Sequence, residues 1–240
     1  MPAVACPLRD LEPLRDLEPL GGLEPQQVPA ATLIGRGCPA PDVLAHDGVM
    51  TDGDLGGRLL VATPLLGDPN FRRTVILIVE DEPDEGTLGV VLNRPTDVPV
   101  GQVLETWTEL VTGPSVVFRG GPVSPNSALA LALARGEDEP LGWRSLDGSS
   151  VMSRVGLVDL EAPPELLAGG VTSFRVFAGY AGWGPGQLNA EIDQGAWYVL
   201  PGEPADAFAA EPELLWPAVL RRQGGELAFV ATYPDDPVLN

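Results

Sequence analysis

The stretch TVILIVEDEPDEGTLGVVLNRP, residues 74–95, sets the fold class. The run 74–79 is apolar without alternation, which is typical of a strand buried on both of its faces. The run 87–92 is a second strand candidate, rich in Val and Leu. The acidic segment 80–85 between them is most simply a solvated turn. The stretch therefore predicts two consecutive strands that help to build a core.

Short apolar runs of the same kind recur along the chain, bounded by Gly, Pro, Asp or Asn. They predict further strands at 58–63, 115–119, 128–133, 151–158, 173–178, 196–200 and 227–232. The run ALALALA at 128–134 is ambiguous, because Ala and Leu also favour helix. Helix candidates are fewer and lie at 99–106, 162–169, 184–195 and 211–225. Since strands outnumber helices and do not alternate regularly with them, we expect an α+β fold around a curved mixed sheet.

The stretch FAGYAGWGPGQLNAEI, residues 177–192, combines glycines with large aromatics and then becomes helix-like. Pro185 stands near the expected helix start and Gly195 just past its end, the usual placement of these residues. A glycine-rich turn that enters a helix exposes free N–H groups, which can bind an anion. Glycine also serves ordinary turn geometry. Both interpretations stay open at this point.

The N-terminal region differs in composition from the rest. Residues 7–25 repeat the unit PLRDLE, and proline interrupts each copy, which argues against a helix and for a solvated tail. Polar and proline-rich character continues to about Asp54, and Met50 lies just before the change. We expect residues 1–49 to form a low-complexity tail and residues 50–240 a single domain. The tail is either an extension or the product of a misassigned start codon.

Composition restricts the partners. The chain carries a formal net charge of −20, and all 14 of its Lys and Arg residues are Arg. Such a balance argues against direct nucleic-acid binding, which depends on clustered cations. No apolar run is long enough for a membrane span, and no secretory signal is visible, so we expect a cytoplasmic protein without a membrane partner.

Several kinds of catalytic chemistry lack their residues in the expected domain. His46 is the one histidine, and Cys6 and Cys38 are the two cysteines; all three precede residue 50. The sequence has neither a P-loop nor a dinucleotide-binding fingerprint, so we expect no cofactor and no metal. Carboxylate chemistry remains, and a hydrolase using Asp68 or Glu191 to activate water is one alternative.

A small set of residues could bind an anion. Arg94 follows an apolar strand directly, and an arginine in that position can clamp an anion or bind carbonyl groups. The pair Gly120-Gly121 permits a sharp turn or a close backbone approach. We expect a candidate ligand site, with no residue assigned a catalytic role, that gathers Asn93, Arg94, Gly120, Gly121, Gly182, Trp183, Gly184, Gly186 and Gln187.

These stretches, taken in order, resemble a known family. GRLLVATPLLGDPNFRRTVILIVEDEPDEGTLGVVLNRP, FRGGPV, FAGYAGWGPGQLNAEI and AWYVLP are similar to the AlgH/YqgE family of bacterial proteins, from about Leu55 to the end. The resemblance implies an α+β fold whose bifurcated sheet wraps into a pseudo-barrel with flanking helices, and a cytoplasmic protein. It implies no established enzymatic reaction, and some members are described as transcriptional regulators.

The sequence departs from that family in two places. Many members have a His where this chain has Glu80 or Asp81, and QLE where it has Gln187-Leu188-Asn189. Any chemistry that depends on that His is therefore absent here. The leading hypothesis is a non-enzymatic regulatory protein that binds a small anion. The alternatives are the carboxylate hydrolase and a transcriptional regulator that acts through a protein partner.

Overall fold

The computed structural model describes residues 55–136, 139–146 and 151–234. The tail of residues 1–49, its repeat, Cys6, Cys38 and His46 all lie outside the described residues.

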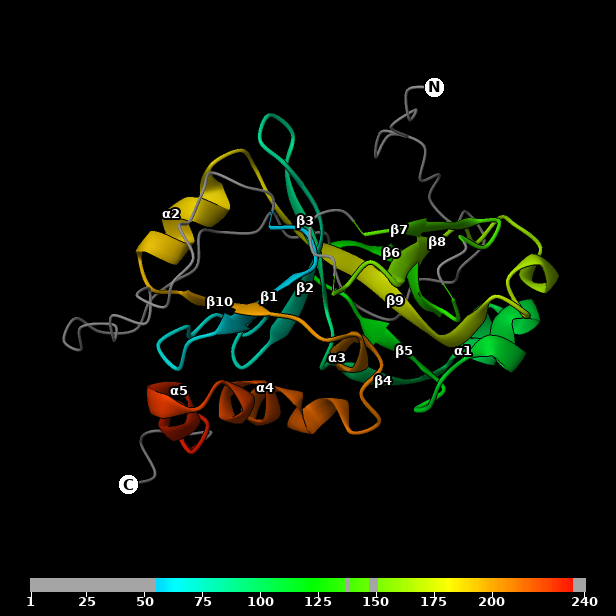
Figure 1. The fold of residues 1–240 in the computed structure, drawn as a ribbon. Coiled ribbons are helices and arrows are strands. Elements are labelled where there is room, and N and C mark those ends of the chain that lie inside the picture. Colours follow the sequence, from blue (N-terminus) through cyan, green and yellow to red (C-terminus); the bar gives the residue numbers. More distant parts are fainter. Residues whose placement is uncertain (1–54, 137–138, 147–150, 235–240) are drawn as a thin grey trace.

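Ten strands build one sheet (Figure 1). They are β1 (Arg58–Ala62), β2 (Val75–Glu82), β3 (Gly86–Val91), β4 (Pro95–Pro99), β5 (Val116–Arg119), β6 (Val123–Ala134), β7 (Trp143–Ser145), β8 (Val155–Val158), β9 (Val171–Trp183) and β10 (Trp197–Pro201). The main order is β10-β1-β2-β3-β9-β6-β8-β7. All pairs are antiparallel except β5 with β9, so the sheet is mixed, as expected.

The sheet divides along β9. The last residues of this strand, Ala181–Trp183, pair with β3, while its preceding part pairs with β6 and β5. The side branch continues from β5 to β4. This curled, bifurcated α+β architecture confirms the fold class expected from the sequence.

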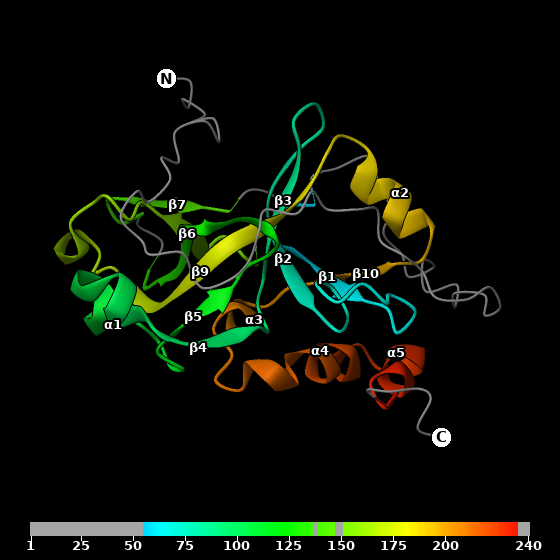
Figure 2. The same cartoon turned by 180° about the vertical axis from the view of Figure 1, so that it is seen from behind.

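The helices are short. They are α1 (Val100–Val103), α2 (Gln187–Asp193), α3 (Pro204–Ala207), α4 (Leu215–Gln223) and α5 (Gly225–Val230), with 3₁₀ turns η2 (Glu105–Leu110), η3 (Pro164–Leu166) and η4 (Pro212–Leu214). In both views α4 and α5 lie on one side of β1 and β10, while α2 lies on the other (Figures 1 and 2). Among the described residues, no helix is long and apolar enough to span a membrane.

Strand β2 lies between two apolar layers, as its continuous apolar run predicts. Val75, Leu77 and Val79 belong to the cluster that includes Trp216 of α4. Ile76 and Ile78 face the other cluster. Because both faces of this strand are covered, its buried residues need no polar alternation.

The ambiguous run 128–134 is part of strand β6. Its leucines face one core, where Leu129 and Leu131 pack with Phe177. Its alanines Ala130 and Ala132 face a second core. The strict alternation of large and small side chains is thus the two-residue period of a strand, not a helical face.

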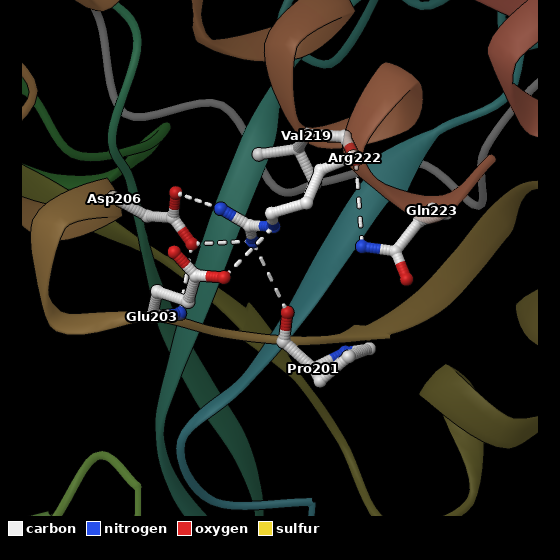
Figure 3. A network of polar contacts seen from close by, with 6 residues as sticks. All are labelled: Pro201, Glu203, Asp206, Val219, Arg222 and Gln223. Carbon is white, nitrogen blue, oxygen red and sulfur yellow. Dashed lines mark hydrogen bonds and ion pairs between the residues drawn. The ribbon is translucent and has the colours of Figure 1, made fainter.

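Arg222 fastens α4 to the turn after β10 (Figure 3). Its Nη1 and Nη2 atoms each lie 2.8 Å from a carboxylate oxygen of Asp206, and its Nε atom lies 3.3 Å from Glu203 Oε1. Asp206 is buried and also accepts the backbone N–H of Glu203, closing a capping box on α3. The hydrogen bond to Asp206 raises the pKa of Arg222, so this arginine stays charged and bound.

One expected strand is a helix. The segment 227–232 was predicted as a strand, but Gly225–Val230 forms α5. Gly224 and Gly225 have positive φ angles, so the chain leaves α4 and starts a new helical turn. Leu227 and Ala231 are buried four residues apart, while Phe229 between them is exposed. The short segment thus buries one helical stripe, which its Leu, Phe and Val content did not reveal.

Other element boundaries differ in extent. The expected helices at 99–106 and 162–169 shrink to α1 with η2 and to η3. The strand expected at 151–158 is confined to β8, and β4 and β7 were not predicted. Strand β4 begins and ends with proline, which the sequence pattern disfavours within a sheet and which edge strands tolerate.

Candidate anion-binding site

Asn93 holds the start of β2 in place. Its Oδ1 atom accepts the backbone N–H of Val75 at 3.0 Å, and its Nδ2 atom donates to the carbonyl of Arg73 at 2.8 Å. The side chain is buried, and its amide oxygen and amide nitrogen both form hydrogen bonds inside the protein. Asn93 therefore positions the turn beside the candidate site.

The turn before β2 carries two arginines, and the backbone of Arg73 is strained. Asp68 is buried, accepts the N–H of Asn70 on its carboxylate at 2.8 Å, and so shapes the turn that leads to Arg72. Arg73 has a φ of 55°, in the left-handed region that non-glycine residues seldom adopt. Its guanidinium stacks 4.3 Å from the Trp216 ring centroid, which helps to hold this conformation.

Arg94 and Arg119 face each other across neighbouring strands. The backbone N–H of Arg119 donates to the carbonyl of Arg94 at 2.8 Å, next to the antiparallel pair Pro95 and Phe118. Side chains of residues directly opposite in an antiparallel pair project from the same face. The Arg94 guanidinium also donates to the carbonyl of Arg72 at 2.5 Å. Three arginines from three segments thus converge.

This arrangement concentrates positive charge. Burial lowers the pKa of Arg94, and the positive charges of Arg72 and Arg119 lower it further. In the described parts of the chain, no carboxylate forms an ion pair with Arg94 or Arg119. The chain as a whole carries a net charge of −20. The group of arginines is therefore a local exception in an acidic chain. An anion placed here would remove the repulsion between like charges.

Gly120 and Gly121 allow the backbone of the β5 end to touch β9. Gly120 donates its N–H to Ala178 and accepts the N–H of Val91, each at 2.8 Å. A Cβ atom on Gly120 would collide with the Gly179 carbonyl oxygen, and one on Gly121 with the backbone of Tyr180. The glycine pair therefore fixes the place where Arg119 leaves the sheet.

The glycine-rich segment before α2 builds a different structure. Gly182 and Trp183 end β9, Gly184 donates its N–H to Gln187, and Gly186 occupies the N-cap position of α2 with a φ of 73°. The positive φ explains the glycine at 186. The turn entering a helix is confirmed.

A buried carboxylate organises this second region. Glu191 accepts the indole N–H groups of Trp183 and Trp197 at 3.0 and 2.9 Å, and the Gln187 amide at 3.1 Å. Phe71 packs against both tryptophans, with its ring centroid 6.3 Å from that of Trp183 and 5.7 Å from that of Trp197, and so anchors its loop in the core. Glu191 thus connects α2 to the ends of β9 and β10.

The structure divides the expected site residues into two groups. Asn93, Arg94, Gly120 and Gly121 lie around the end of β3. Trp183 instead pairs with Thr87 at the start of β3, and the residues that follow it lead into α2. Six residue steps separate Thr87 from Asn93, or roughly 20 Å of extended chain. Gly182 lies near the first group, because a Cβ on Gly121 would meet the backbone of Tyr180 and Ala181. The segment from Trp183 onward is apart from Arg94 and leads into α2.

Part of the charged group is not predicted by the sequence. Arg119 and Arg72 are not among the expected site residues, although FRGGPV and FRRT contain them. The available signal was an arginine at the end of each of two apolar runs, but only the strand register makes Arg94 and Arg119 neighbours. Within the described segments, no group of His, Cys, Asp and Glu is arranged to hold a metal ion.

Comparison with known proteins identifies the fold. The X-ray structure of protein DIP2367 from Corynebacterium diphtheriae matches with a TM-score of 0.69 and 34% identity, over 74% of this chain and 91% of that one. The solution structure of the AlgH protein from Pseudomonas aeruginosa matches with a TM-score of 0.53 and 27% identity, over 77% and 96%. Both neighbours share the curled α+β architecture.

Relatives in sequence extend over most of the chain. A UPF0301 protein of Thermobifida fusca is 59% identical over 189 residues, which is 78% of this chain and 96% of the relative. The UPF0301 protein SCO2948 of Streptomyces coelicolor is 61% identical over 190 residues, or 78% and 95%. The sequence profile described as AlgH-like matches residues 59–228. The chain therefore belongs to the AlgH-like family, as its sequence motifs indicated.

Proposed function

We propose that this chain is a cytoplasmic, non-enzymatic regulatory protein that binds a small anion between Arg94 and Arg119. The observation that carries the proposal is the placement of these two arginines opposite each other, Arg94 directly before β4 and Arg119 at the end of β5, without an acidic partner among the described residues. Guanidinium groups bind carboxylates and phosphates through charge-assisted hydrogen bonds.

The rigidity of the surrounding backbone supports this assignment. The Arg94 guanidinium is fixed through the Arg72 carbonyl, and the backbone beside Arg119 through the glycine pair against β9. A backbone that is already in place lowers the conformational entropy lost when a ligand binds. The site lies at the junction of three strands, and we infer that occupancy there is the regulatory signal.

The hydrolase alternative has weaker support. Its two candidate carboxylates have contacts that account for their positions: Asp68 shapes a turn, and Glu191 accepts hydrogen bonds from two indoles and an amide. A carboxylate that activates water needs a free oxygen directed toward a substrate cleft. The contacts of Glu191 favour a role in holding α2 to the sheet.

A protein-partner role in transcription is the remaining alternative. The net charge of −20 opposes direct attachment to duplex DNA. A mobility-shift assay with duplex DNA at increasing salt concentration distinguishes direct DNA binding from regulation through a protein partner. A salt-sensitive shift would contradict the small-anion proposal as stated and would assign the arginines to phosphates of nucleic acid.

The test of the proposed function is thermal denaturation of the full 240-residue chain with phosphate, nucleotides and small carboxylates at constant ionic strength. A ligand at a hundredfold excess over its dissociation constant adds about 2.7 kcal/mol of stability. Arg94→Ala should remove the shift, while Arg58→Gln, at the exposed first residue of β1, should keep it. No shift with any compound, or an equal shift in Arg94→Ala, would contradict the proposal.

A further inference from the structure

A small apolar cavity lies between α1 and the sheet formed by β5, β9 and β6. Its volume is about 20 Å³, and its exposed lining is almost entirely apolar. This space holds one methyl or methylene group. The lining residues are Val103, Leu104, Val117, Pro125, Asn126, Ser127, Ala128, Val176, Phe177 and Ala178.

The strand register brings Arg119 to the rim of this cavity. Val117 lines the cavity, and Arg119 lies two residues further along β5, so both side chains project from the same face. Arg119 also pairs with Ala178 of β9, another lining residue. Phe118, between them, faces the opposite core, where it packs 5.8 Å from the Phe177 ring.

Arg94 completes the charged end of this arrangement. It stands opposite Arg119 across the β4–β5 pair and therefore shares its face of the sheet. Two guanidinium groups thus adjoin an apolar space, and alternate residues of a strand are separated by roughly 7 Å. A hydrocarbon chain of about four to six carbons spans this distance, so it could connect an anionic group at the arginines with the cavity.

We propose that the ligand is a short-chain aliphatic carboxylate, whose charged end binds Arg94 and Arg119 and whose hydrocarbon end enters the cavity beside Val117. This inference rests on the proposed anion-binding function and specifies its ligand class. Inorganic phosphate satisfies the arginines but leaves the cavity unused. A carboxylate with a hydrocarbon chain uses both features.

Isothermal titration of the full chain with phosphate, acetate, propionate, butyrate and hexanoate tests the proposal. Each methylene that enters the cavity should strengthen binding about fourfold. Because the cavity admits one methylene and lies about four to six carbons from the arginines, acetate and propionate should bind alike, and affinity should rise about fourfold between propionate and hexanoate. Arg119→Gln should abolish binding of the whole series, whereas Arg58→Gln should leave it unchanged.

Two variants at the cavity separate chain recognition from charge. Ala128→Leu should fill the space and reduce hexanoate to the affinity of acetate, with phosphate binding unaltered. Val117→Ala should enlarge the space and strengthen hexanoate binding further, which provides a second test if the filled variant does not fold.

The outcomes distinguish this inference from the proposed function. Arginine-dependent binding of phosphate and acetate without any chain-length effect would overturn the ligand class and leave the function standing. No arginine-dependent binding of any compound would overturn both. A chain-length effect that persists in Arg119→Gln would contradict the pairing of the cavity with these arginines.

Discussion

The positive charges of Arg222 and Arg94 have opposite surroundings. Arg222 lies against Asp206 and Glu203, and these partners raise its pKa (Figure 3). Arg94 lies beside Arg72 and Arg119, and burial together with these cations lowers its pKa. A paired arginine contributes to the stability of the fold, while an arginine next to other cations is better placed to bind an external anion.

Arg175 provides a third environment. It is buried in the centre of β9, donates to the carbonyls of Ala207, Gly113 and Ala209 at 3.1, 3.2 and 2.9 Å, and lies 4.3 Å from the Phe118 ring centroid. Desolvation lowers the pKa of Arg175 to about 10. This cation joins two loops to the sheet through neutral partners. It therefore differs from both Arg222 and Arg94.

The largest expected effect is at Arg175. Arg175→Ala should lower the free energy of unfolding by about 3–5 kcal/mol, because it creates a cavity and leaves buried carbonyls without donors. Urea denaturation measures the change. A loss below about 1 kcal/mol would show that this buried cation is not what joins the loops.

The next effect is at the paired arginine. Arg222→Ala leaves the buried carboxylate of Asp206 without its cation and should cost about 2–3 kcal/mol, less than a fully buried pair because Arg222 is partly exposed. Urea denaturation at pH 7 measures it. Stability equal to that of the wild type would contradict a stabilising role for the pair.

A pH dependence should follow from Arg175. Its folded pKa of about 10 lies below the ordinary value of an arginine, so above pH 10 the unfolded chain binds more protons than the folded one. Stability from this group therefore rises as pH increases above 10 and is lost as pH falls through 10. Between pH 9 and pH 11 the wild type should gain about 1 kcal/mol relative to Arg175→Met. An equal pH response of the two proteins would contradict the lowered pKa.

The smallest expected effect is at the candidate site. Arg119→Gln removes one of two like charges on opposite residues and should stabilise the ligand-free protein by about 0.5 kcal/mol at low salt. Added sodium chloride should shrink this difference, because salt screens exposed charges. Thermal denaturation at two ionic strengths measures it. A destabilised variant would mean that Arg119 already has a favourable partner in the ligand-free protein.

Sequence reasoning succeeded where local pattern and environment agree. The unbroken apolar run 74–79 predicts a strand buried on both faces, and β2 has this form. The acidic segment 80–85 predicts a turn, but β2 continues through Glu82 and the turn to β3 takes only residues 83–85. Gly186 likewise occupies the left-handed position expected of a glycine at a turn into a helix. These features depend on a few neighbouring residues.

The remaining features depend on residues far apart in the chain. Nothing in the local sequence aligns Arg94 with Arg119, since that neighbourhood arises from the β4–β5 register. Trp183, Trp197 and Glu191 meet only after β10 has joined β1 and brought the end of α2 back to the sheet. Segment 227–232 favours a strand by composition, but the packing of its apolar residues against α4 selects the helix α5.

The central claim is that Arg94 and Arg119 form an anion site. Equilibrium dialysis of labelled phosphate against the full chain, at low and constant ionic strength, tests it most directly. We predict retention by the wild type and by Arg58→Gln, and loss of retention in the double variant Arg94→Ala, Arg119→Gln. Equal retention by the wild type and the double variant, or none by the wild type, would contradict the claim.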